Sequence, residues 1–155
     1  MRIAIVALGH RMPAWVVTGY GEYARRLPRE FALELIELKP EPRSRGKSIS
    51  HVVAAEAVRI RAACVGCTVV ALDENGAAWT TLKLARHIGR WRDDGARVAF
   101  VIGSADGLAP SIKGTAVHTL ALSALTLPHG LVRVLLAEQL YRAASLLAGH
   151  PYHRA

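Results

Sequence analysis

The regular alternation of apolar strand-like runs with helical patterns most constrains the fold of this chain. Strand-like runs cover residues 3–8, 31–38, 68–72, 97–102 and 118–122, and helical patterns cover 13–27, 50–64, 80–94, 109–114 and 131–147. Such alternation predicts an α/β fold with a mostly parallel sheet and helices on both faces. The 155 residues fit a single domain, 1–155, and the 52% hydrophobic content is enough for a substantial core.

Residues that start and stop helices stand near the expected boundaries. Pro13 suits the first turn of a helix because its missing N–H is not needed there. Ser48 or Ser50 can cap the helix that follows the 39–47 loop, and a threonine at 80–81 can cap the next one. Gly95 stands where that helix should end.

Three loops are candidates for a ligand site because they follow strands that should run parallel. They begin after Leu72, Ile102 and Leu122 and are rich in Gly, Ser, Thr or Asp. Ligands of open α/β sheets bind at the carboxyl ends of strands. The 103–107 loop matches neither a dinucleotide fingerprint nor a P-loop, and by itself it could be a simple turn. The apolar 122–128 loop could be a buried crossover or could wrap an apolar or aromatic ligand.

The last helix, 131–147, is apolar nearly all round its circumference. A helix that is apolar on every face should be buried on every face. A domain of this size encloses a terminal helix with difficulty, so we expect a subunit interface and a homodimer. Glu138 and Arg142 stand four residues apart and should form an ion pair. Arg133 could be a solvated charge or a buried group that needs partners.

Charge favours a polyanionic partner. The net charge is +8, which points to nucleic acid unless it merely reflects the source organism. No signal peptide or apolar stretch of membrane-spanning length is evident, so we expect no membrane partner and a cytoplasmic protein. Cys64 and Cys67 lack a second ligand pair and close a helix, so we interpret them as incidental small, partly buried residues and expect no metal site.

The final residues combine polar side chains that suit chemistry on a nucleobase. Tyr152, His153 and Arg154 follow Pro151 with one residue remaining. Histidine changes charge near neutral pH, and tyrosine and arginine can stack on or hydrogen-bond to bases. We therefore expect this terminus to be tied into a site, although isolated histidines such as His129 are more often structural.

The chain resembles the RlmH family of SPOUT methyltransferases over essentially its whole length. The resemblance is carried by Gly9-His-Arg-Met-Pro-Ala-Trp15, Val70-Ala-Leu-Asp73, residues 102–107, Ser123-Ala-Leu-Thr-Leu-Pro-His129, Arg133, Glu138-Gln-Leu-Tyr-Arg142 and Pro151-Tyr-His-Arg154. It implies a C-terminal trefoil knot, a homodimer and the cofactor S-adenosyl-L-methionine. It also implies methylation of N3 of a pseudouridine in 23S rRNA of the large ribosomal subunit, on assembled ribosomes. A same-fold enzyme acting on another RNA such as tRNA, and a non-catalytic RNA-binding relative, remain alternatives.

The resemblance also implies the residues of the site. The cofactor would be held by Leu72, Gly103, Ser104, Leu122, Ser123, Ala124, Leu125, Thr126 and Leu127. The catalytic residues would be His153, Tyr152, Arg154 and Arg142, with residues 152–154 lying over the cofactor cleft near the target base. Ser104 departs from the family, which usually has a second glycine there. Its Cβ adds a side-chain atom to a loop that could need an unusual backbone conformation.

Overall fold

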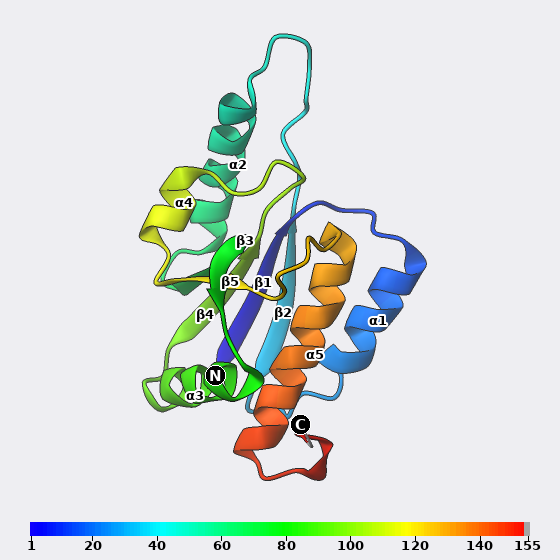
Figure 1. Ribbon diagram of the computed structural model, residues 1–155, viewed down its shortest axis with the longest axis vertical. Helices are drawn as coiled ribbons and strands as arrows, with labels where there is room; N and C mark the ends of the chain where they lie inside the picture. The colour runs from blue at the N-terminus through cyan, green and yellow to red at the C-terminus, as the bar shows by residue number, and fades with distance from the viewer. Residues whose placement is uncertain (154–155) are drawn as a thin grey trace.

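Five parallel strands form one sheet in the order β2-β1-β4-β3-β5. The computed structural model describes residues 1–153, without the side chain of His153. The strands are β1 (Arg2–Leu8), β2 (Ala32–Leu38), β3 (Thr68–Ala78), β4 (Arg97–Ile102) and β5 (His118–Ala121). The α/β fold with a parallel sheet is confirmed, and all strands end at the same edge (Figure 1).

Helices cover both faces of the sheet, as expected from the alternating pattern. They are α1 (Ala14–Ala24), α2 (Ile49–Ala63), α3 (Thr81–Asp93), α4 (Pro110–Thr115), α5 (His129–Leu147) and a short 3₁₀ turn at Pro151–His153. Ile5 and Phe100 point to a core shared with α3 and α5, whereas Val6 and Val101 point to a core shared with α2 and α4. The opposite directions of neighbouring side chains follow from the two-residue period of a strand.

Two predicted helix caps are present. The Ser48 hydroxyl accepts a hydrogen bond of 3.1 Å from the amide of His51, and the Thr80 hydroxyl accepts one of 3.1 Å from the amide of Lys83. Each cap satisfies an amide in the first turn that has no partner within the helix. Gly95 lies just beyond α3 with φ +66°, as its role at a helix end requires.

The third strand differs from the expectation that it ends before Asp73. It continues to Ala78, with a register shift against β5 between Leu72 and Ala77. Gly76 permits this irregular stretch, because a Cβ there would lie 2.8 Å from backbone atoms of Leu120. The Asp73 carboxylate also accepts a 2.8 Å hydrogen bond from the amide of Asn75. Residues 73–76 therefore form an irregular stretch within β3, between its two segments that pair with β5.

The last helix begins at His129, two residues earlier than expected, and its burial arises largely within one chain. The sheet, α1 and α3 surround α5, and none of its residues is fully exposed (Figure 1). A Cβ on Gly19 of α1 would lie 3.2 Å from the Val134 side chain. The apolar pattern of α5 therefore does not by itself require a second subunit. Among the helices of the described residues, none has both the length and the apolar character needed to cross a membrane.

Candidate functional site

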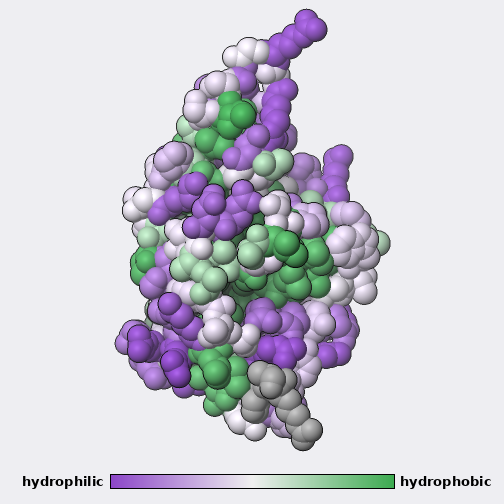
Figure 2. Space-filling view, viewed as in Figure 1, coloured by the Kyte–Doolittle hydropathy of each residue, from purple (hydrophilic) through white to green (hydrophobic). Residues whose placement is uncertain are grey.

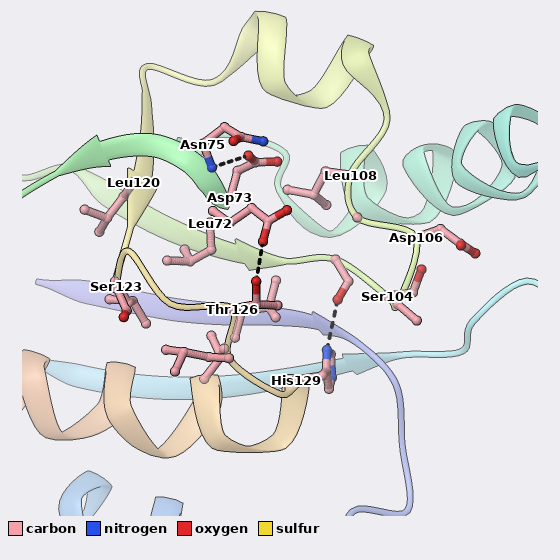
Figure 3. A pocket seen from close by; sticks show the side chains of 18 of the residues that line it. Leu72, Asp73, Asn75, Ser104, Asp106, Leu108, Leu120, Ser123, Thr126 and His129 are labelled. Carbon is pink, nitrogen blue, oxygen red and sulfur yellow. Dashed lines mark hydrogen bonds between the residues drawn. The ribbon is translucent and has the colours of Figure 1, made fainter.

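A cavity of about 470 Å³ lies at the carboxyl edge of the sheet, where three loops meet. The loops follow Leu72 in β3, Ile102 at the end of β4 and Ala121 at the end of β5, so the predicted meeting of these segments is found (Figure 3). The predicted residues that line it are Leu72, Gly103, Ser104, Leu122, Ser123, Leu125, Thr126 and Leu127. Ala124 is exposed in the same loop but does not line the cavity.

The loop after β4 folds back tightly on itself. The amide of Gly107 donates a 2.9 Å hydrogen bond to the carbonyl oxygen of Ser104. A Cβ on Gly103 would lie 2.7 Å from the carbonyl carbon of Gly107, closer than real Cβ contacts come. Glycine is therefore required at position 103 because two backbone segments approach each other there.

Ser104 holds this loop in place and does not strain it. Its hydroxyl donates a 2.7 Å hydrogen bond to the buried carboxylate of Glu56 and accepts one of 3.2 Å from Nη2 of Arg43. Within residues 1–153, Arg11 is the only non-glycine residue with a positive φ, so the backbone of Ser104 is not in the left-handed region. The serine therefore connects the cavity to α2 and to the loop between β2 and α2, which the sequence did not indicate.

The apolar loop after β5 is open to solvent and is not a buried crossover. Leu125 is 75% exposed. The loop is shaped by its hydroxyls, since Ser123 Oγ accepts a 2.9 Å bond from the Leu125 amide and Thr126 Oγ1 donates one of 2.9 Å to Glu74. Apolar side chains held at the mouth of a cavity favour the second sequence interpretation, a loop that wraps a ligand.

His129 joins two of the segments around the cavity. Its Nδ1 lies 2.9 Å from the carbonyl oxygen of Gly103, and its Nε2 lies 3.2 Å from Nη2 of Arg133 (Figure 3). Because arginine only donates, Nε2 must accept, and we therefore assign the proton to Nδ1, which donates to Gly103. Burial, and then the Arg133 charge, lower the pKa of His129, so the neutral ring is favoured.

Arg133 has partners, which resolves the alternatives that the sequence left open. Its side chain is 1% exposed. Nη1 donates to the Glu37 carboxylate at 2.6 Å, and Nη2 donates to the carbonyl oxygen of Gly9 at 2.8 Å. The arginine thus fastens the start of α5 to the turn after β1 and to β2.

Polar side chains that the sequence did not assign also line the cavity. They are Asp73, Glu74, Asn75, Asp106 and Lys113. Asp73, Glu74 and Asn75 directly follow the apolar run 68–72, and Asp106 lies in the loop after β4, so position after a strand is the signal that could have identified them. Lys113 lies in α4, and no such signal marks it. Asp73 pairs with Lys113 at 3.3 Å. Within residues 1–153, no cluster of three or more His, Cys, Asp or Glu side chains could hold a metal ion.

The predicted catalytic residues that the structure describes lie together at the other end of α5. Glu138 Oε1 accepts hydrogen bonds from Nε of Arg142 at 2.9 Å and from the Tyr152 hydroxyl at 3.3 Å. This confirms the predicted Glu138–Arg142 pair. A helix rises 1.5 Å per residue, so Arg142 lies roughly 20 Å along α5 from His129 and the cavity.

Arg142 and Tyr152 therefore lie away from the cavity of their own chain, so within one chain Tyr152 does not lie over the cleft. The Arg142 guanidinium lies 4.9 Å from the centre of the Tyr152 ring, and the centre of the Tyr141 ring lies 4.5 Å from that same centre. These contacts hold Tyr152 against the far end of α5. The side chain of His153 and all of Arg154 lie outside the described residues.

Relatives of the same length are similar to this chain throughout. A protein of Nitrosospira multiformis named "Ribosomal RNA large subunit methyltransferase H" is 56% identical over 156 residues, covering 100% of both chains. A protein of the same name from Burkholderia mallei is also 56% identical over 100% of both chains.

A solved structure shows the same fold at low identity. A probable methyltransferase from Bordetella pertussis superposes with a TM-score of 0.57 at 17% identity, covering 92% of this chain and 93% of that one. The profile of the family described as "Predicted SPOUT methyltransferase" matches residues 1–153. With its parallel sheet, its three-loop cavity and full-length similarity at 56% identity, the chain belongs to the SPOUT methyltransferase family.

Proposed function

We propose that this chain methylates N3 of a pseudouridine in 23S rRNA of the large ribosomal subunit, using S-adenosyl-L-methionine, and that it acts on assembled ribosomes in the cytoplasm. Residues 1–155 would form one catalytic domain. The observation that carries the proposal is the cavity at the carboxyl edge, built from the three loops that the family resemblance assigns to the cofactor. Full-length relatives named as ribosomal RNA large subunit methyltransferases support rRNA as the substrate.

The residues around the cavity fit a cofactor with an aromatic base, a sugar and a charged amino-acid part. The cavity of about 470 Å³ is within the range of small-molecule sites. Leu72, Leu122 and Leu127 offer apolar surface, and the Asp73 and Glu74 carboxylates offer hydrogen-bond acceptors. Backbone amide and carbonyl groups of the three loops supply further donors and acceptors.

The reaction needs little from the protein beyond positioning and removal of one proton. Bound S-adenosyl-L-methionine supplies a methyl group already activated by a positively charged sulfur. N3 of the base forms the new bond to this carbon while the carbon–sulfur bond breaks, and the N3 proton must leave. We assign its acceptance to His153 or to a water held by it, with Tyr152, Arg142 and Arg154 orienting base and phosphate.

This assignment requires a homodimer. Since Arg142 and Tyr152 lie roughly 20 Å along α5 from the cavity of their own chain, they can serve only a cavity of a second subunit. Trp15 and Val17 on α1 are 57% and 61% exposed and offer an apolar surface beside α5 for such contact. We further propose that the 122–127 segment and α5 belong to the trefoil knot of the family.

Methyl transfer from labelled cofactor to several RNA substrates tests the proposal. Assembled ribosomes, separate large subunits and tRNA would be prepared from a strain lacking this gene. We expect label in the 23S rRNA of assembled ribosomes. Label in tRNA alone would support the alternative enzyme, and absence of cofactor binding in calorimetry would support the non-catalytic alternative.

A further inference from the structure

We propose that a basic rim beside the cavity binds the phosphate backbone of the RNA substrate. The rim consists of Arg11 in the turn after β1, together with Lys39 and Arg45 in the loop between β2 and α2. This inference rests on the proposed function for the existence of an RNA substrate. It adds which face of the protein the RNA contacts and which side chains hold it.

The rim and the cavity lie along one edge of the sheet. The turn and the loop follow the carboxyl ends of β1 and β2, and the Gly9 amide joins them by a 2.9 Å hydrogen bond to the Leu38 carbonyl. Arg43 extends the loop to the cavity, because its Nε donates a 2.7 Å hydrogen bond to Asp106 of the cavity wall. RNA lying on the rim would therefore pass beside the cavity mouth.

The turn that carries Arg11 is held in an unfavourable conformation. Arg11 has φ +56°, in a region that non-glycine residues rarely adopt. Such strain persists only where the surroundings fix it, and it is frequent at functional sites. Two residues before Arg11, Arg133 anchors the turn: its side chain is 1% exposed and its Nη2 donates to the Gly9 carbonyl at 2.8 Å. The result is that Arg11 is presented to solvent at the edge of the sheet.

Acidic side chains near the rim are neutralised within the protein. Glu37 pairs with Arg133 at 2.6 Å, Glu41 with Lys47 at 2.9 Å, and Asp106 with Arg43 at 2.7 Å. The exposed Arg11, Lys39 and Arg45 then leave positive charge on this edge. Figure 2 shows hydrophilic side chains projecting from the loop between β2 and α2, above an apolar area over α5 and the loop that precedes it.

A surface that binds the phosphate backbone of RNA needs positive charge, and it does not need groups that recognise individual bases. Phosphate contacts from lysine and arginine set the position of a nucleic acid on a protein, whereas base contacts supply sequence specificity. The rim would place the rRNA segment, and the cavity region would select the base. This division fits the position of Arg11, Lys39 and Arg45 beside the cavity.

Arg11→Gln and Arg45→Gln test the rim, with Arg2→Gln as the matched control. Arg2 is exposed at the amino end of β1, so its change removes the same charge at the opposite edge of the sheet. Ribosome affinity would be measured over a range of salt concentrations. We expect each rim variant to lower the slope of log affinity against log salt by about 0.7 to 0.9, the value for one phosphate contact. Arg2→Gln should leave the slope unchanged.

Arg11→Gly separates binding from structure. Glycine relieves the positive-φ strain, so we expect an equal or higher melting temperature together with weaker ribosome binding. Cofactor affinity by calorimetry and the dimer by sedimentation should match the unmodified protein in every rim variant. If Arg11→Gln loses the cofactor or the dimer, the turn is structural and the rim is wrong.

The failure of this inference can be told apart from the failure of the proposed function. If the unmodified protein methylates ribosomes but the rim variants behave like Arg2→Gln, the rim is wrong and the function stands. If the protein modifies tRNA instead, the same comparison of variants, measured as affinity for tRNA over a range of salt concentrations, tests the rim. If it binds no RNA at all, both proposals fail.

Discussion

Nη2 of Arg133 lies 2.8 Å from the carbonyl oxygen of Gly9, 124 residues away in the sequence. The same nitrogen lies 3.2 Å from Nε2 of His129, whose other ring nitrogen lies 2.9 Å from the Gly103 carbonyl. One buried guanidinium therefore connects the turn after β1, the first turn of α5 and the loop after β4. Two of these segments, the first turn of α5 with His129 and the loop after β4, line the candidate cavity.

Arg133→Met should lower the free energy of unfolding by about 1–3 kcal/mol, the usual cost of leaving a buried polar group without its partner. The Gly9 carbonyl would lose its donor, whereas Glu37, 39% exposed, would stay hydrated. The buried Nε of Arg133 has no partner among the described residues, so its removal offsets part of the cost. Denaturant unfolding measures the change, with Arg142→Met, at the far end of α5, as the control for loss of an arginine.

His129 should affect cofactor affinity through its bond to Gly103. His129→Leu removes the donor and should weaken binding about tenfold, as expected for about 1.4 kcal/mol. His129→Asn can place an amide N–H near the position of Nδ1 and should keep affinity within about threefold. Calorimetry with S-adenosyl-L-methionine distinguishes the two variants. Equal loss in both would show that the ring, rather than its hydrogen bond, matters.

The sequence predicted the sheet, the helix caps and the meeting of three loops at the carboxyl edge because local pattern determines each of them. The continuation of β3 past Asp73 could not be predicted, since it depends on Gly76 packing against Leu120, 44 positions later in the numbering. Nor could the partners of Arg133, because Gly9 and Glu37 are distant in sequence. The separation of Tyr152 from the cavity follows from the length of α5, which a motif comparison does not convey.

Stability should fall as the pH falls below about 6.5, the ordinary pKa of histidine. Burial lowers the pKa of His118, His87 and His129. Neighbouring charged or titrating groups lower each pKa further: Lys83 acts on His118, His118 acts on His87, and Arg133 acts on His129. Below about 6.5 the unfolded chain binds more protons than the folded one, so the free energy of unfolding decreases until the folded-state pKa values are passed.

Thermal unfolding between about pH 8 and about pH 5 measures this dependence. His118→Phe keeps an aromatic ring beside Trp79, which His118 contacts edge-on at 5.0 Å, but removes one titrating group. The decline with falling pH should become shallower in this variant. An unchanged pH dependence would mean that His118 does not contribute to it.

Mixed dimers test whether one subunit completes the site of its partner. Gly103→Ala should destroy the cavity, because its Cβ would lie 2.7 Å from Gly107, while Gly114→Ala meets no atom within 4 Å and serves as the control. A chain ending after Pro151 should keep the cavity but lose the terminus. Each variant alone should be inactive, and random mixing should restore about a quarter of full activity through heterodimers with one intact site. No recovery in mixed dimers would show that the terminus does not act across subunits.

Mass spectrometry of nucleosides from 23S rRNA tests the central claim most directly. Ribosomes from a strain lacking this gene would be incubated with the protein and S-adenosyl-L-methionine, then digested. The account predicts that N3-methylpseudouridine appears with the unmodified protein and with Gly114→Ala, and not with Gly103→Ala. Cofactor-dependent methylation of a different nucleoside, or none in any RNA while the cofactor binds, would contradict it.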